Sequence, residues 1–124
     1  MNEAAQPTVV WSEIPVLDLE KGMAFYGAVI GTPLTLQKGQ PNDQAILPGG
    51  DFSGGHLYVG TPAANGAGPS VHVACAGALE DAMERAQQAG AQVISPAIAM
   101  PFGRFGYIID PDGNSIGLFE PKAA

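Results

Sequence analysis

The chain has 124 residues, which suits one compact domain, and 46% of them are apolar, so it can bury a hydrophobic core. Its net charge of −7, with five basic residues, excludes the basic patch of a nucleic-acid-binding protein and the basic amphipathic segment of a membrane-surface protein. The single cysteine, Cys75, excludes an internal disulfide, and the sequence has neither a secretory signal nor an apolar run of about 18 residues, so we expect a cytoplasmic protein.

The first half of the chain is predicted to open with a strand and a helix. Residues 9–16 alternate in character, so that one face of the strand is apolar and the other carries Trp11 and Glu13. Asp18 is a good N-cap for the helix predicted over 19–30, where apolar residues recur at helical spacing. Three shorter strands are then predicted, over 34–36, 45–47 and 56–59.

The second half repeats this order after a linker. Residues 61–69 are the predicted linker because they are rich in Gly, Pro and Ala. A strand is predicted over 71–75 and an amphipathic helix over 79–89. The sequence Asp110-Pro111-Asp112-Gly113 favours a tight turn before the last strand. The later strands are predicted over 92–95, 107–109 and 115–119.

The two halves match in register as well as in order. Gly31 and Gly90, which are predicted to end the helices, lie 59 residues apart, and so do Ile14 and Val73 on the first strand of each half. We therefore predict an α+β fold of two tandem βαβββ modules, which form a curved mixed sheet around a central cleft. The predicted boundaries are a tail at 1–8 and one domain at 9–121, with modules at about 9–60 and 70–120 and the linker at 61–69.

The strand faces that point away from the helices are expected to line this cleft. An apolar strand face packs on a helix, whereas a mixture of aromatic, titratable and small side chains suits a ligand-binding hollow. Strand alternation assigns these residues to the cleft side: Trp11, Glu13, His56, Tyr58, Ser70, His72, Gly117 and Phe119.

Segments at both ends of the chain are similar to those of one known superfamily. Residues 13–19, followed by Ala24-Phe25-Tyr26 and Ile30-Gly31, look like its opening module. Residues 102–107, followed by Asp110-Pro111-Asp112-Gly113-Asn114, look like its closing hairpin. In this order, and over about residues 9–121, they resemble the glyoxalase/bleomycin-resistance/extradiol-dioxygenase (vicinal oxygen chelate) superfamily. The resemblance implies a small-molecule ligand and a homodimer.

The metal positions of that superfamily are incompletely kept in this chain. The resemblance places the usual glyoxalase ligands near Trp11, on the strand over 56–59, near Ser70 and near Gly117. Trp11, Ser70 and Gly117 are not competent metal ligands. The sequence therefore departs from a typical glyoxalase I, whose chemistry needs the full metal site.

A displaced site is the alternative. Glu13 and His72 lie 59 residues apart, the repeat offset, so the pseudo-twofold relation is expected to place them opposite each other across the cleft. They are the candidate catalytic residues, and with His56 they form a candidate ligand set for one divalent metal ion, zinc or similar. Without a metal, the same side chains could carry out acid–base chemistry.

Each of these residues also has a structural interpretation. A histidine on a strand is more often a satisfied structural residue than a ligand, and Glu13 could form an ordinary ion pair with Arg104. Arg104 is also a candidate contact for an anionic substrate group. Trp11, Tyr58 and Phe119 could stack on a planar ligand or simply fill the cleft.

Two main functions are therefore predicted. One is a glyoxalase-like, metal-dependent lyase or isomerase that acts on a small oxygenated molecule. The other is a metal-free, bleomycin-type binding protein that sequesters an antibiotic and catalyses nothing. A third interpretation is a degenerate site in a domain that acts through interaction alone.

Overall fold

The computed structural model describes residues 11–39, 42–49, 54–101 and 103–122. The predicted tail at 1–8 and the first two residues of the predicted opening strand lie outside this part of the chain. The described elements are β1 (Trp11–Val16), α1 (Leu19–Ile30), β2 (Thr35–Gln37), β3 (Gln44–Ile46), β4 (Gly54–Val59), the 3-10 turn η1 (Ala64–Gly66), β5 (Val71–Ala74), α2 (Leu79–Gln88), β6 (Gln92–Val93), β7 (Ile98–Met100), β8 (Gly103–Ile109) and β9 (Ser115–Pro121).

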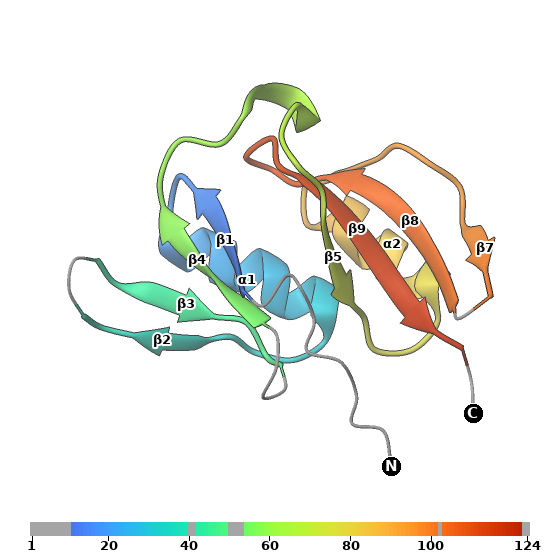
Figure 1. Cartoon of the computed structure of the whole chain (residues 1–124), viewed down its shortest axis with the longest axis horizontal. Helices are drawn as coiled ribbons and strands as arrows, with labels where there is room; N and C mark the ends of the chain where they lie inside the picture. The colour runs from blue at the N-terminus through green and yellow to red at the C-terminus, as the bar shows by residue number, and fades with distance from the viewer. Residues whose placement is uncertain (1–10, 40–41, 50–53, 102, 123–124) are drawn as a thin grey trace, which may run out of the picture.

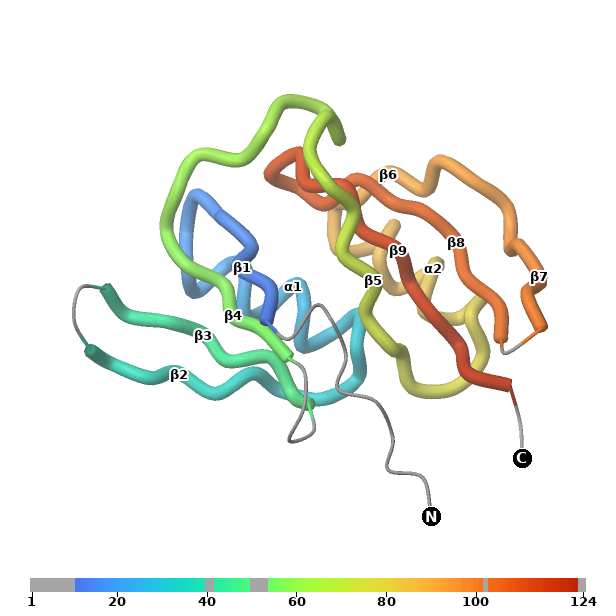
Figure 2. Tube along the Cα trace, viewed as in Figure 1, coloured from blue at the N-terminus to red at the C-terminus, as the bar shows by residue number. Residues whose placement is uncertain are grey.

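The strands form two mixed sheets, one from each half of the chain. The first sheet has the order β1-β4-β3-β2, and the second has the order β5-β9-β8-β6 with β7 also paired to β8. In both sheets the first strand of the half pairs in parallel with its last strand, β1 with β4 and β5 with β9. The sheets lie side by side with α1 and α2 behind them (Figures 1 and 2). The predicted α+β fold of two repeated modules is confirmed.

The second module contains more strand than the sequence pattern indicated. β7 was not predicted, and β8 starts four residues before the predicted strand. Gly103 and Gly106 made this stretch look like a loop, but both are required by packing inside the strand. A Cβ on Gly103 would lie 2.4 Å from the Glu120 carbonyl oxygen, and a Cβ on Gly106 would lie 3.2 Å from the Met83 sulfur.

Local sequence explains the position of α1. The Asp18 carboxylate accepts a hydrogen bond from the Lys21 amide at 2.9 Å and so caps the first turn. Gly31 ends the helix with φ of 93°, a left-handed conformation that favours glycine. On the sheet side, Gly22 allows close packing, because a Cβ there would lie 3.1 Å from Leu57 and 3.2 Å from Val16.

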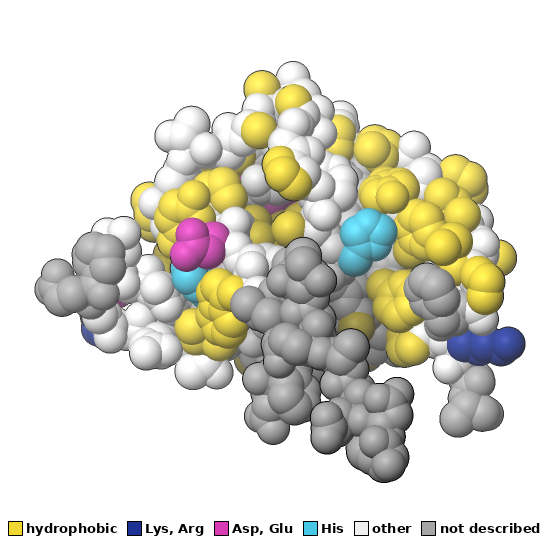
Figure 3. All heavy atoms as spheres, viewed as in Figure 1, with side chains coloured by type: hydrophobic (Ala, Val, Ile, Leu, Met, Phe, Trp, Pro, Cys, Tyr) yellow, Lys and Arg dark blue, Asp and Glu magenta, His cyan; other side chains and the backbone are white. Residues whose placement is uncertain are grey.

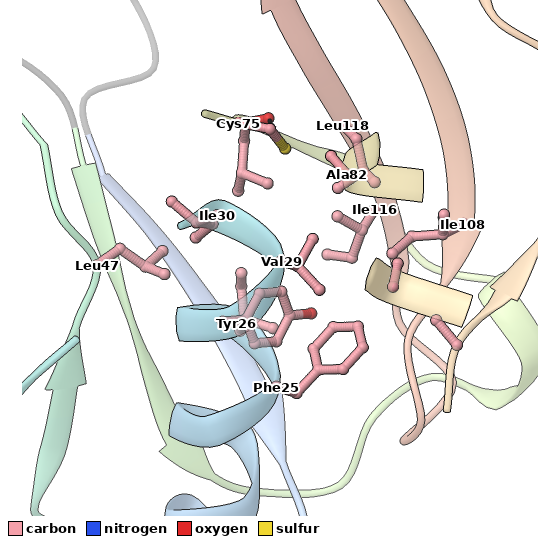
Figure 4. Packing of buried hydrophobic residues seen from close by; sticks show 14 of the residues in the cluster. Phe25, Tyr26, Val29, Ile30, Leu47, Cys75, Ala82, Ile108, Ile116 and Leu118 are labelled. Atoms are coloured by element: carbon pink, nitrogen blue, oxygen red, sulfur yellow. Dashed lines mark hydrogen bonds between the residues drawn. The ribbon is translucent and has the colours of Figure 1, made fainter. Parts of the chain in front are cut away.

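One hydrophobic core lies between the helices and the sheets. Val29 of α1 is fully buried, and in Figure 4 its side chain points toward Ile116, which is 1% exposed. Residues from both halves therefore share this core. Among the described residues, no helix is long and apolar enough to cross a membrane.

A buried carboxylate joins the two halves. Asp110 is 4% exposed, and its Oδ2 accepts a hydrogen bond from the Tyr26 hydroxyl at 2.5 Å. Its Oδ1 accepts bonds from the backbone amides of Asp112 and Asn114, both at 2.9 Å. The Asn114 side-chain amide donates both to Asp110 and, at 2.7 Å, to the Pro15 carbonyl oxygen of β1. The predicted turn thus also fastens the second module to α1 and β1.

Arg85 makes a second connection between the modules. Its guanidinium on α2 donates to the carbonyl oxygens of Ala28 and Val29, at 3.0 Å and 3.1 Å, and to that of Ala76 at 3.3 Å. The first two carbonyls belong to the last turn of α1, where helical partners are missing. The positive charge also suits the negative end of the helix dipole.

Arg104 organises an ion cluster beside α2. It makes two hydrogen bonds to Glu80, at 2.7 Å and 2.9 Å, and also pairs with Glu120. Glu120 in turn accepts a bond from the Leu79 amide at the start of α2. Hydrogen bonds from Arg104 lower the pKa of Glu80 to about 2 and also lower the pKa of Glu120.

The Tyr26→Phe variant is expected to destabilise the fold while leaving the ring packing in place. Burial, followed by the nearby Asp110 carboxylate, raises the pKa of the Tyr26 hydroxyl, so this group stays protonated and donates. Loss of a hydrogen bond to a buried carboxylate should lower the free energy of unfolding by about 1.5–3 kcal/mol. Urea denaturation measures this change. Tyr107→Phe is the matched control and should change stability by less than about 0.5 kcal/mol; equal midpoints for the two variants would contradict the proposed connection.

The Arg104→Gln variant should be destabilised most near neutral pH. A carboxyl group whose pKa is lower in the folded than in the unfolded chain stabilises the fold above its unfolded pKa, and this stabilisation is lost as the pH falls through the folded pKa. For Glu80 the pKa is 4.5 in the unfolded chain and about 2 in the folded chain. The difference in unfolding free energy between wild type and variant should therefore be largest near pH 7 and shrink between about pH 5 and pH 2.

Urea denaturation at pH 7, 5 and 3 checks this expectation. Lys122→Gln is the control, because it removes one positive charge from an exposed residue that has no ion pair in the described part of the chain. A pH-independent loss in the Arg104 variant would show that the cluster does not stabilise the fold through these carboxylates.

Candidate functional site

The first sheet presents Trp11, Glu13, His56 and Tyr58 on the face opposite α1. Ile14 and Leu57 alternate with them and are 2% and 0% exposed, because they pack into the core. Glu13 and His56 are direct neighbours in the parallel register of β1 and β4. Strand alternation therefore places the Glu13 carboxylate beside the His56 imidazole, on the side of the sheet that the sequence predicted.

His56 is held between Trp11 and Glu13. The Trp11 indole Nε1 donates to His56 Nδ1 at 2.8 Å. Since Nδ1 acts as an acceptor, the proton of the neutral imidazole is assigned to Nε2. That nitrogen lies 3.7 Å from Glu13 Oε2. Both ring nitrogens of this buried histidine are thus directed at other side chains of the protein.

Glu13 is the exposed end of this arrangement. Its side chain is 65% exposed, whereas that of His56 is 6% exposed. The Glu13 carboxylate therefore has the His56 imidazole on its buried side and is open to solvent on the other. It can accept hydrogen bonds from a ligand or attract a positive charge.

His72 has a different environment on the second sheet. It pairs in register with Gly117, and a Cβ on Gly117 would lie 2.7 Å from His72 Nδ1, so the ring lies directly over this glycine. The His72 ring centroid is 5.4 Å from that of Phe105 and 5.5 Å from that of Tyr107. The exposed imidazole of β5 therefore lies over a glycine of β9 and beside two aromatic rings of β8.

Phe105 and Tyr107 are cleft-side residues that were not predicted from the sequence. A signal was present, because both alternate with Gly106 and Ile108, which face α2 and the core. Extending the predicted strand at 107–109 back to residue 103 would have assigned the two rings to the same side as His72.

Two adjoining hollows lie between the sheet edges. The larger has a volume of about 690 Å³ and is bounded by Trp11 on one side and by His72 and Phe119 on the other. The smaller, of about 150 Å³, includes Glu13. Both hollows are also bounded by Pro69 and Val71. The predicted cleft between the modules is therefore present.

The predicted metal set of Glu13, His56 and His72 is not brought together. Glu13 and His56 are neighbours, but the His72 ring packs on the second sheet against Phe105 and Tyr107. Figure 3 shows the histidine side chains on two separate parts of this face, one of them beside an acidic side chain. Within the described residues, no group of three His, Cys, Asp or Glu side chains could hold a metal ion. The donor set thus does not fit the predicted divalent ion.

Of the remaining predicted cleft residues, three lie on the cleft side and Arg104 does not. Trp11 and Phe119 border the larger hollow, and the Tyr58 ring lies next to His56 with centroids 6.2 Å apart. Arg104 is different, because it shares the helix-facing side of β8 with Gly106 and is bound by Glu80 and Glu120. The structure thus corrects the prediction of Arg104 as a cleft residue and its alternative pairing with Glu13.

Comparisons with known proteins agree with this architecture. A family model described as Glyoxalase/Bleomycin resistance protein/Dioxygenase superfamily matches residues 8–118. A glyoxalase/bleomycin resistance protein from Albidiferax ferrireducens T118 has a TM-score of 0.71 and 21% identity, and the match covers 94% of this chain and 100% of that one. A comparison with curated proteins finds no match.

Two proteins from Streptomyces sp. CB03234 are similar at higher identity. TnmS3, an antibiotic binding protein, has a TM-score of 0.62 and 27% identity, with 97% of this chain and 100% of that one covered. A glyoxalase/bleomycin resistance protein has a TM-score of 0.63 and 26% identity, with 90% of this chain and 99% of that one covered. The predicted fold is shared by all three structures.

The tautomer assigned to His56 is directly testable by nitrogen-15 NMR of the imidazoles, because the chain has two histidines. In its neutral form His56 should be a single Nε2–H tautomer, since Trp11 occupies Nδ1. Trp11→Phe should weaken this preference, because the acceptor role of Nδ1 is lost and only the Glu13 carboxylate near Nε2 still favours the Nε2–H tautomer, with the His72 signals as the internal control. A protonated Nδ1 on His56 in the wild type would contradict the arrangement.

Proposed function

This chain belongs to the glyoxalase/bleomycin resistance protein/dioxygenase superfamily, and on that basis we propose that it binds a flat aromatic small molecule, without a metal ion, in the cleft between its two sheets. The proposal rests on the hollow between the sheets, which has aromatic side chains on both sides. The titratable side chains near it do not converge on one point, as a metal ion would need. Stacking and hydrogen bonding, rather than coordination, are then the interactions that the cleft offers.

The size and lining of the larger hollow support a ligand of drug-like size. Its volume of about 690 Å³ falls within the roughly 300–1,000 Å³ of small-molecule sites. Trp11 and Phe119 stand on opposite sides, so a flat ring between them would cover apolar surface of both modules. Trp11 is 48% exposed, and covering its indole would stabilise a complex through apolar burial and stacking.

The charge near the cleft supports a ligand that carries a donor or a positive group. Glu13 is exposed, and the nearby His56 has both nitrogens directed at protein groups. Arg104, which could have attracted an anion, is bound by two carboxylates on the other side of the sheet. An exposed carboxylate favours hydrogen-bond donors and cations over anions.

The comparison with TnmS3 supports binding over catalysis by a metal. That relative is an antibiotic binding protein, and the similarity extends over 97% of this chain at 27% identity. A metal-dependent lyase or isomerase requires at least three convergent ligands, whereas in the part of the chain that the structure describes only Glu13 and His56 of the predicted ligands adjoin. We therefore propose sequestration of an aromatic, antibiotic-like molecule as the function. The homodimer and the cytoplasmic location remain predictions.

Trp11 offers a direct assay because it is the only tryptophan in the sequence. Titration with proflavine, a flat aromatic cation, should change the Trp11 fluorescence and raise the thermal unfolding temperature, equally before and after dialysis against EDTA. Phe119→Ala should weaken binding about tenfold, because one stacking wall is lost. Ile94→Ala is the matched control, since Ile94 is 55% exposed and borders neither hollow.

Two outcomes would overturn the proposed function. One is the absence of any fluorescence or stability change with proflavine and with other flat aromatic compounds. The other is binding that disappears in EDTA and returns with zinc, which would favour a metal-dependent enzyme.

A further inference from the structure

The two histidines of the chain are used differently. His56 is buried and directs both ring nitrogens at Trp11 and Glu13. His72 is exposed, borders the larger hollow, and has no hydrogen-bond partner for either nitrogen among the described residues. Only His72 therefore has its full hydrogen-bonding capacity available to a ligand.

Packing fixes the position of the His72 ring. Gly117 lies beneath it and Phe105 and Tyr107 lie beside it, with the distances given above. Gly117 is also the register partner of both His72 and Tyr107, so the missing side chain is what lets the two rings approach each other. A polar group held by packing loses little freedom when it binds a ligand.

The chemistry of a neutral imidazole defines the group it recognises. One nitrogen donates and the other accepts, so the ring can pair with a hydroxyl in either direction. Phe119 borders the same hollow and contributes apolar surface to it. A flat ring that carries a hydroxyl at its edge would satisfy both features at once.

We propose that His72 is a specificity-determining residue, which selects hydroxylated aromatic molecules by a hydrogen bond to a phenolic hydroxyl. This inference rests on the proposed function, because it names the class of flat ligand that the cleft prefers. It assigns His72 a role in recognition that is separate from that of Glu13, which borders the smaller hollow.

A matched pair of probes tests the assignment. 2-Naphthol and 2-methylnaphthalene have nearly the same shape, and only the first can hydrogen-bond. Their dissociation constants, measured by Trp11 fluorescence and by ligand-observed NMR at pH 7.5, should differ about three- to tenfold in favour of 2-naphthol, as one neutral hydrogen bond allows. In His72→Phe this preference should fall to about one, while the affinity for 2-methylnaphthalene stays within about twofold.

Further variants separate the alternatives. Gly117→Ala keeps both nitrogens but introduces a Cβ that would lie 2.7 Å from the ring, so it should shift His72 and also reduce the preference. If His72→Phe fails to fold, the preference for 2-naphthol is measured in Gly117→Ala instead. The control Ile94→Ala, at an exposed residue that borders neither hollow, should leave the preference unchanged. A preference that is lost in Glu13→Gln but kept in His72→Phe would reassign the hydroxyl to Glu13 and overturn the proposal.

The outcomes distinguish this inference from the proposed function. Binding of both probes with equal affinity, or a preference that persists in both His72→Phe and Gly117→Ala, overturns the role of His72 alone. Failure of the wild type to bind either probe, or any flat aromatic compound, overturns the proposed function as well.

Discussion

The buried carboxylate of Asp110 is the constraint on which the rest of the structure depends. Its oxygens accept four hydrogen bonds, from the Tyr26 hydroxyl, two backbone amides and the Asn114 side chain. A buried charge needs such partners, because an unpaired one would be expensive to remove from water. Asn114 continues the connection to β1, and Arg85 adds a second one at the last turn of α1. The relative position of the two sheets, and thus the shape of the cleft between them, follows from these contacts.

Within that frame, the two modules have the same backbone plan but different side chains. Glu13 pairs in register with His56 on the first sheet, whereas His72 pairs with Gly117 on the second. Where the first sheet has an imidazole that supports a carboxylate, the second has a glycine over which an imidazole lies. The two sides of the cleft therefore differ, because the first sheet adds the Glu13 carboxylate to Trp11 whereas the second presents His72 among aromatic rings. This difference makes the cleft suitable for an asymmetric ligand with a flat ring and a polar edge.

Much of the fold could be predicted from the sequence because its signals are local. Asp18 and Gly31 mark the ends of α1, and alternation places Glu13, His56 and His72 on the cleft side of their strands. The metal site could not be predicted correctly, because the side-chain face of a strand does not determine whether three residues converge. Whether they converge depends on the distance between the two sheets and on where each ring packs. The His72 ring, for example, packs over Gly117 on the second sheet. The same limit applies to Arg104, whose partners Glu80 and Glu120 lie 24 and 16 residues away in the chain.

The central claim is that a flat ligand occupies the hollow between the two sheets. The most direct measurement is a backbone amide NMR titration of the whole chain with a flat aromatic ligand such as proflavine. The account predicts that the largest shifts occur around Trp11, Ser70, His72 and Phe119, with little change in the groove beside Leu17 and Pro111 on the helix side. Shifts concentrated in that second groove, with the residues between the sheets unchanged, would contradict the account.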